Sequence, residues 1–181
     1  LKGQKLMAEA VGETDDISGI TARMKSIEAN FNKAFWNGVE YRSPDYEGET
    51  DDRSQALAVV SGLAKPEQYP AIREVLRTQV HCSPYMEKYV AEALYQMRFE
   101  EDAIARSKKR YEYMTNHEYT TLFEGWEIGK KGFGGGTINH AWSCCMLTLL
   151  SKYGAGVAPV TPGYETYHVR PQMGPLKHIK T

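Results

Sequence analysis

Hydrophobic residues recur at steps of three and four along most of the chain, the spacing that places them on one face of a helix. The clearest case runs from Thr14 to Phe35, where polar residues fill the positions between them. The same spacing predicts further helices over Asp52–Leu63, Glu67–Val80, Tyr85–Met97, Phe99–His117 and Thr137–Tyr153. The pattern therefore predicts a mainly α protein with six helices.

The six predicted helices differ in how much of their surface is apolar. Those that start at Asp52, Tyr85 and Thr137 are apolar over a broad face, so we expect them to be buried. The other three carry a polar stripe and should face water. Short connections make neighbouring helices antiparallel. Hairpins in a ring, with the apolar helices inside, would give this order, and the predicted fold class is part of an α/α toroid.

After Gly156 the pattern changes. The remaining segment contains four prolines and a period-two run through Tyr164, Thr166, His168 and Arg170, which predicts turns and strands. We expect residues 1–157 to form helical hairpins and residues 158–181 to begin a C-terminal β-sandwich domain. The alternative is a β tail that folds back over the helices.

Composition narrows the possible partners. Lysine and arginine number 22 against 23 acidic residues, spread along the chain for a net charge of −1, which argues against a nucleic-acid partner. The longest apolar run, Met146–Leu150, is too short to span a bilayer, so we expect no membrane partner. His and Cys lack zinc-site spacings, so the sequence predicts no metal and no cofactor. The cysteines, including the adjacent Cys144 and Cys145, are interpreted as small buried hydrophobes.

The segment from Tyr119 to Trp142 concentrates residues with chemical potential. Glu124 lies between the aromatic residues Phe123 and Trp126, and a carboxylate among apolar neighbours is a candidate general base. Trp126 and Trp142 offer aromatic faces that stack on a sugar ring. Each also has an ordinary structural interpretation, as an ion-paired carboxylate or as core tryptophans.

A glycine-rich loop, Gly129–Gly136, follows the carboxylate, and we expect it to be mobile or to adopt backbone angles that side chains forbid. Thr137 is then predicted to cap a helix. That places Asn139 and His140 in its first turn, where unpaired amides favour bound oxygens. The alternative for His140 is a hydrogen-bonded core histidine. Tyr85 and Asp52, at the starts of inner helices, are weaker candidates for the same rim.

Several stretches together carry a family resemblance. TTLFEGW, GTINHAWS, LLSKYGAGVAPVTPGYETYHVRPQMG and DDRSQALAVVSGLA resemble the C-terminal part of bacterial α-L-rhamnosidases of glycoside hydrolase family 78. The resemblance implies part of a catalytic (α/α)6 barrel followed by a β-sandwich. It also implies hydrolysis of terminal α-L-rhamnosyl groups with inversion, so the substrate would be a rhamnose-containing glycan or glycoside.

The resemblance assigns roles residue by residue. Glu124 matches the general base of a TTxWE-type motif, and His140, after Asn139, matches a sugar-contacting histidine. Phe123 stands where tryptophan is usual, and Cys144 and Cys145 stand where glycine is commoner; these changes affect the wall beside the base and the packing behind the pocket.

Nothing in the chain matches the family's general acid. We therefore expect the acid upstream of Leu1, in the remainder of the same barrel, and the isolated chain to be inactive. If the acid lies within the chain, the likeliest substitutes are Glu47, Glu49, Asp51 and Asp52. The alternatives are another (α/α)6-barrel glycosidase with a different sugar, or a noncatalytic helical carbohydrate-binding or scaffold module. The compartment stays open between the bacterial periplasm or exterior and the cytoplasm.

Overall fold

The structure is a computed structural model that describes residues 1–128 and 136–180. It divides into two compact units, Leu1–Gly48 and Glu49–Thr181. The first unit consists of helices α1 (Lys2–Val11) and α2 (Thr14–Phe35), which pack on each other. Gly12, in the left-handed conformation that glycine tolerates best, ends α1 and reverses the chain. Helix α1 was not predicted from the sequence, whereas α2 has the predicted bounds.

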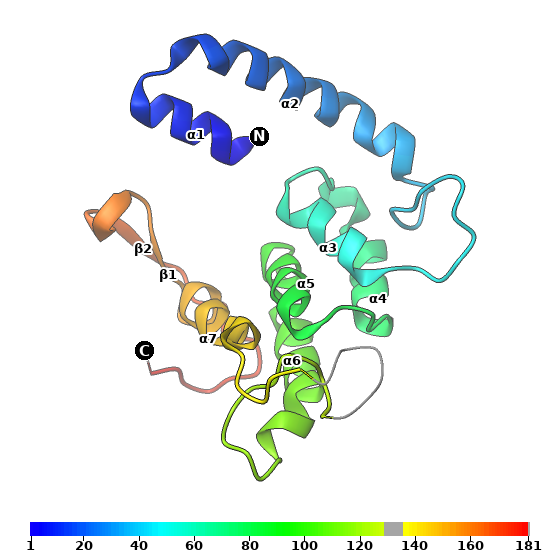
Figure 1. Cartoon of the computed structure of the whole chain (residues 1–181), viewed down its shortest axis with the longest axis vertical. Coiled ribbons are helices and arrows are strands. Elements are labelled where there is room, and N and C mark those ends of the chain that lie inside the picture. Colours follow the sequence, from blue (N-terminus) through cyan, green and yellow to red (C-terminus); the bar gives the residue numbers. More distant parts are fainter. Residues whose placement is uncertain (129–135, 181) are drawn as a thin grey trace. The chain divides into compact units, whose positions relative to one another are not determined.

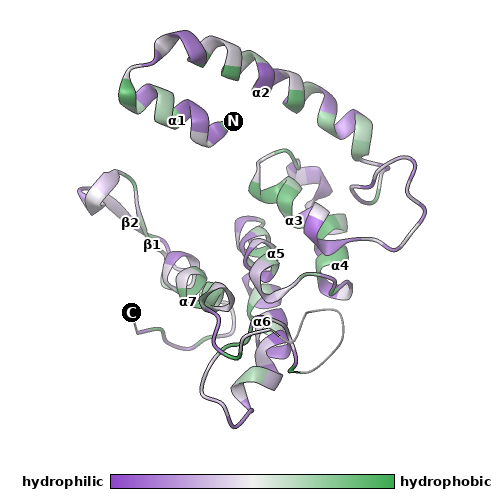
Figure 2. Cartoon of the chain, viewed as in Figure 1, coloured by the Kyte–Doolittle hydropathy of each residue, from purple (hydrophilic) through white to green (hydrophobic). Residues whose placement is uncertain are grey.

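No residue of α2 is buried, although it carries an apolar stripe. Figure 2 shows hydrophobic patches alternating with hydrophilic ones along its length. Near its end the ring of Phe31 lies 5.3 Å from that of Tyr41, and Trp36 pairs with Tyr41 in an isolated β-bridge. These aromatic contacts hold the turn that follows α2 against its last residues.

The second unit contains five α-helices among the described residues, joined by short helical turns. They are α3 (Asp52–Val60), α4 (Tyr69–Thr78), α5 (Pro84–Gln96), α6 (Glu100–Thr115) and α7 (Cys145–Leu149), with 3-10 turns at Pro66–Gln68, Ala141–Cys144 and Pro162–Tyr164 and a π turn at Leu150–Gly154. Caps set two of the starts, because Asp51 accepts the amide of Arg53 and Ser83 accepts that of Met86.

Helix α5 is the centre of this unit and contacts α3, α4, α6 and α7 (Figure 1). More than half of the residues of α3 and α5 are buried, against fewer than half of those of α4 and α6. Helix α5 lies between α3 and α7 in the order of contacts, while α4 contacts α3 and α5, and α6 contacts α5. This arrangement of inner and outer helices confirms the predicted part of an α/α toroid.

The last helical segment departs from expectation in two ways. It starts at Ala141, not at Thr137, and passes through 3-10, α and π turns in succession. It is also less buried than its apolar sequence predicts, since Leu147 is 74% exposed and Cys144 is exposed as well. The interpretation of all three cysteines as buried hydrophobes is therefore wrong for Cys144 and right for Cys82 and Cys145.

A small antiparallel hairpin follows the last helical segment, as the proline-rich alternating pattern predicts. Strands β1 (Val157–Pro159) and β2 (Tyr167–Val169) pair with Ala158 opposite His168. Gly156, which precedes β1, has φ +74°, and a Cβ there would lie 2.1 Å from the backbone of Arg170. Glycine is required where the returning chain crosses so closely. Whether a separate domain begins at residue 158 stays a prediction.

No helix in the described part of the chain is long and apolar enough to cross a membrane. Over the same residues, no group of three or more His, Cys, Asp or Glu side chains is arranged to hold a metal ion.

Candidate active site

The segment around Glu124 follows α6 without regular secondary structure, yet its backbone is held in place. Glu124 donates its amide to the carbonyl of Thr137 at 2.9 Å, and His140 donates its amide to the carbonyl of Leu122 at 2.8 Å. Phe123 anchors the segment, because its side chain is only 2% exposed and packs in a core cluster with Tyr111 and others. The candidate base therefore sits on a fixed backbone although it lies in a loop.

A second set of bonds joins this segment to the helical turn that starts at Ala141. The Ser143 hydroxyl donates to the carbonyl of Phe123 at 2.5 Å. The Tyr111 hydroxyl, from α6, donates to the carbonyl of Ser143 at 2.8 Å. Burial raises the pKa of Tyr111 far above its usual range, and the neighbouring Cys145 adds to the effect, so this phenol stays protonated and serves as a donor. The site thus rests on the buried part of α6.

The carboxylate of Glu124 is held but remains accessible. Its side chain is 32% exposed, and its Oε2 accepts the amide of Thr137 at 3.0 Å and lies 3.9 Å from Nδ1 of His140. A Cβ at Gly136 would lie 2.7 Å from Oε2 of Glu124, so the chain needs glycine at this position to approach the carboxylate. The carboxylate is oriented by the residues that follow the glycine-rich loop.

Aromatic side chains lie beside the carboxylate. The ring of Trp142 is 4.3 Å from that of His140 and 5.4 Å from that of Tyr85, measured between centroids. The indole N–H of Trp142 also donates to the backbone carbonyl of Glu124 at 3.3 Å. Trp142 is 38% exposed and Tyr85 43% exposed, so both rings keep accessible surface, Trp142 beside Glu124 and His140 and Tyr85 beside Trp142. Tyr85, at the start of α5, thus joins the predicted site residues in space.

The other two predicted contact residues lie differently. Asn139 is exposed, one residue before His140. Trp126 is half-buried, with its ring 5.2 Å from that of Tyr111 and 4.0 Å from the guanidinium carbon of Arg110. Its indole N–H donates to the carbonyl of Cys82 at 2.7 Å. The polar atom of Trp126 is therefore directed to the backbone that precedes α5.

The predicted helix cap at Thr137 is wrong. The Thr137 amide binds Glu124 and its hydroxyl lies 2.7 Å from Nδ1 of His140, so both groups serve the site and neither starts a helix. Asn139 and His140 consequently precede the first helical turn. Of the glycine-rich loop, Gly129–Gly136, only the last residue is described, and the prediction of a mobile or glycine-dependent backbone lies outside the described residues.

Two of the acidic residues considered as an internal acid have structural contacts instead. Asp51 caps α3, with its Oδ1 accepting the amide of Arg53 at 2.8 Å. Asp52 is 0% exposed, and its Oδ2 accepts from Nη2 of Arg106 at 2.7 Å. A fully buried carboxylate bound to a guanidinium is closed to a substrate, so Asp52 does not join the site.

The partner of Asp52 was itself missed by the sequence analysis, which placed Arg106 on a solvated helix. Arg106 is 8% exposed, and its Nε donates to Oε1 of Glu87 at 2.7 Å. Burial disfavours the charged guanidinium, but its hydrogen bonds and ion pairs with Glu87 and Asp52 outweigh burial and raise the pKa of Arg106. The sequence held only a weak signal for this ion-pair cluster, namely that two helices predicted to be buried each carry an acidic residue that needs a basic partner.

The comparisons with known proteins concern the family and the fold. A family model described as the bacterial alpha-L-rhamnosidase 6 hairpin glycosidase domain matches residues 1–153. The solved GH78 family rhamnosidase of Bacillus sp. GL1 is 20% identical with a TM-score of 0.73, and the match covers 96% of this chain and 20% of that one. The α-L-rhamnosidase from Dictyoglumus thermophilum is 20% identical with a TM-score of 0.75, covering 92% and 20%.

None of the curated proteins matches this sequence. The chain spans about a fifth of the two solved rhamnosidases, and at 20% identity their likeness shows a shared fold. The family model, in contrast, extends over most of the chain, from the first unit through the site and the last helical turn. On this ground the chain belongs to the bacterial α-L-rhamnosidase six-hairpin glycosidase domain family.

Proposed function

We propose that this chain supplies the general base of an inverting α-L-rhamnosidase and that Glu124 is that base. The observation that supports this most directly is the state of its carboxylate. It is one-third exposed, oriented by the Thr137 amide and bordered by His140 and Trp142. A base must hold one orientation and still reach water, and Glu124 meets both conditions.

The reaction needs two carboxyl groups on opposite sides of the scissile bond. Glu124 takes a proton from a water molecule as the oxygen of that water forms a bond to the anomeric carbon. The bond to the leaving oxygen breaks while a carboxylic acid protonates that oxygen. The two groups stand about 6.5–9.5 Å apart in inverting enzymes, which leaves room for the water. We assign the acid to the remainder of the barrel.

The neighbouring residues would bind the sugar, a terminal α-L-rhamnosyl group of a glycan or glycoside. His140 can hydrogen-bond a sugar hydroxyl through the ring nitrogen that does not face Thr137 and Glu124. Trp142 offers an exposed aromatic face for the apolar side of the pyranose. Asn139, exposed beside His140, is placed to contact a further hydroxyl.

The test is Glu124→Gln in the intact enzyme, assayed with 4-nitrophenyl α-L-rhamnopyranoside. The amide keeps the shape of the side chain but cannot take the proton, so kcat should fall about 10²- to 10⁴-fold with KM nearly unchanged. Glu118→Gln, an exposed change in the same loop, is the matched control and should retain wild-type kcat.

The stereochemistry is tested separately, on the wild-type enzyme. NMR of the first product should show β-rhamnose. Wild-type turnover in Glu124→Gln would refute the base assignment, and α-rhamnose as first product would refute inversion.

A further inference from the structure

Two side-chain donors meet at the backbone carbonyl of Cys82, in the short link between α4 and α5. The carbonyl accepts the indole N–H of Trp126 at 2.7 Å and Nη2 of Arg110 at 2.6 Å. The Arg110 guanidinium carbon also lies 4.0 Å from the centroid of the Trp126 ring. Trp126 is therefore bound along its N–H edge and by a cation on its ring. These contacts tie the loop of the candidate base to the start of the central helix.

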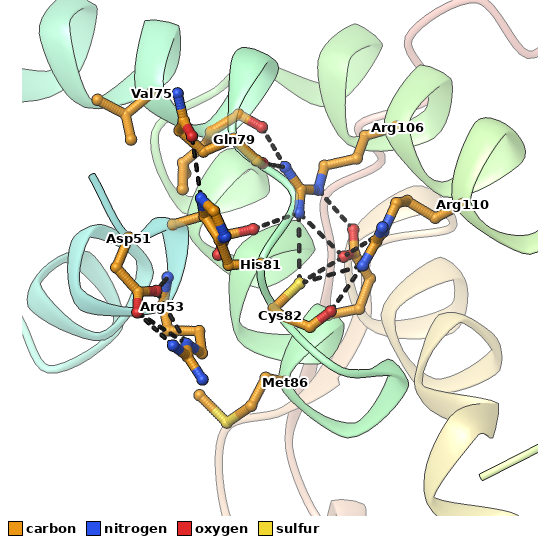
Figure 3. Close-up of polar contacts among 12 residues, drawn as sticks. Asp51, Arg53, Val75, Gln79, His81, Cys82, Met86, Arg106 and Arg110 are labelled. Carbon is orange, nitrogen blue, oxygen red and sulfur yellow. Dashed lines mark hydrogen bonds and ion pairs between the residues drawn. The ribbon is translucent and has the colours of Figure 1, made fainter. Parts of the chain in front are cut away.

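The link that bears Cys82 is fixed by buried charges. Arg106 donates to the carbonyl of Gln79 at 2.6 Å, and Figure 3 shows Arg106 and Arg110 reaching from the same helix toward Cys82. The Cys82 thiol donates to Oε2 of Glu87 at 2.8 Å. Burial raises the pKa of this thiol far above its usual range, and the charge of Glu87 adds to the shift, so it stays a donor.

The charges in this cluster balance. Glu87 and Asp52 are both 0% exposed and face the two guanidinium groups of Arg106 and Arg110. Displacing Arg106 would leave Asp52 buried without its charged partner and Glu87 without its nearer guanidinium, which is strongly unfavourable. The cluster therefore resists displacement, and the Cys82 carbonyl gives Trp126 a rigid point of attachment.

Trp126 follows Glu124 by two residues in the sequence, whereas the hydrogen bonds described for the candidate site involve the backbone of residues 122–124. Backbone carbonyls of Leu122, Phe123 and Glu124 accept from His140, Ser143 and Trp142. Two residues after Glu124, the bond from the indole N–H of Trp126 to the Cys82 carbonyl adds a long-range hydrogen bond on the other side of the carboxylate. The backbone that bears the carboxylate is thus held before and after the carboxylate, by two separate parts of the fold.

We infer that Trp126 is a positioning residue, which orients Glu124 through the bond between its indole N–H and the Cys82 carbonyl. This inference rests on the proposed role of Glu124 as base. In this role the indole N–H of Trp126 has a function, whereas stacking on a sugar would not involve the N–H. A stacking role needs only the aromatic ring, whereas the positioning role needs the N–H, so the two roles separate experimentally.

The experiment is Trp126→Phe in the intact enzyme, assayed with 4-nitrophenyl α-L-rhamnopyranoside beside Glu124→Gln. Phenylalanine keeps an aromatic ring under Arg110 but loses the donor. We expect kcat to fall about 10- to 100-fold, because displacements of about 1 Å cost that much, while KM changes less than about 3-fold. A stacking role alone would instead raise KM and spare kcat.

The matched control is Tyr153→Phe, which also removes one hydrogen-bonding group from a half-buried aromatic side chain. The Tyr153 hydroxyl donates to Glu92 at 3.0 Å and accepts from Gln96, the last residue of α5. Tyr153 is therefore attached to the opposite end of α5 from Cys82, which lies before the first turn of that helix. This variant should keep wild-type kcat. If Tyr153→Phe loses as much kcat as Trp126→Phe, general destabilisation explains both losses and the inference is overturned.

The remaining outcomes separate the inference from the proposed function. Wild-type kcat in Trp126→Phe with an inactive Glu124→Gln overturns the positioning role alone, while an active Glu124→Gln overturns both. If Trp126→Phe does not fold, benzothienylalanine incorporated at position 126 takes its place. This isostere keeps both rings and replaces only the N–H with sulfur, so kcat should fall with KM unchanged; wild-type kcat there would overturn the inference.

Discussion

Two glutamates of the second unit, Glu87 and Glu124, occupy opposite environments. Glu87 is 0% exposed, with Oε1 bound to Arg106 and Oε2 bound to both Arg106 and Cys82. Glu124 is one-third exposed, and among the described residues its side-chain contacts all fall on Oε2. One carboxylate has both oxygens occupied by donors, and the other is oriented through a single oxygen.

The difference shows which surroundings make a carboxylate a structural group and which leave it able to react. A buried carboxylate must keep a charged partner, since loss of that partner leaves an uncompensated charge. A reactive carboxylate needs enough bonds to fix its direction and enough exposure to reach water. Removing the partners of Glu87 should therefore unfold the helices around it, whereas disturbing the partners of Glu124 should reduce turnover and leave the fold intact.

The largest expected effect on stability comes from Arg106→Met. It leaves Asp52 and Glu87 buried without the guanidinium that binds both, and breaking a buried pair in this way costs about 3–5 kcal/mol. Amide hydrogen exchange of the intact enzyme, followed on peptides from α5 and α6, should show a lower opening free energy by that amount.

Arg77→Met is the control for that measurement. Arg77 is half-exposed and pairs with Glu74 at 3.1 Å and with Asp102 at 3.5 Å; because Asp102 also keeps its ion pair with Arg73, the loss should stay below about 1 kcal/mol. Equal opening free energies in the two variants would remove the contrast between buried and exposed charge on which the comparison depends.

A smaller effect, on activity, is expected from Gly136→Ala. The added methyl group would meet Oε2 of Glu124 at 2.7 Å and its Cβ at 2.8 Å, so the carboxylate has to move. We expect kcat to fall up to about 100-fold with little change in stability. Gly19→Ala, in α2, adds the same methyl group with no atom within 4 Å and should leave kcat unchanged. Full turnover in Gly136→Ala would mean that the direction of the carboxylate does not matter.

The smallest effect should follow His140→Ala. Loss of a hydrogen bond to the sugar should raise KM and lower kcat together, for a decrease of about 10-fold in kcat/KM. His168→Ala, in the hairpin strand β2, is a matched histidine control. Wild-type kinetics in His140→Ala would assign that histidine to the structural contact with Thr137 alone.

The sequence predicted those features that repeat along the chain. Helix α2 has the predicted bounds, Thr14–Phe35, because its apolar stripe is long and Asn37 and Gly38 follow it. The burial of α3 and α5 follows equally from their broad apolar faces. The residues around Glu124 were found through a local motif, which the structure places beside Trp142 and His140.

Features that depend on distant partners escaped the sequence analysis. Thr137 has the composition of a helix cap, but its amide binds a carboxylate thirteen positions earlier. Arg106 lies in a strongly charged segment, and its partners Asp52 and Glu87 are buried on other helices. Nothing in the local pattern encodes these partners, because each pairing exists only once the helices are packed.

The close crossing at Gly156 has an evolutionary consequence. Because Gly156 touches the backbone of Arg170, the chain leaves and re-enters the helical unit at one point. The intervening hairpin has an exposed tip at Pro162–Tyr164, and exposed tips whose flanking ends stay together tolerate inserted sequence. Sequence inserted at this tip, by evolution or by design, should therefore leave Glu124 in place.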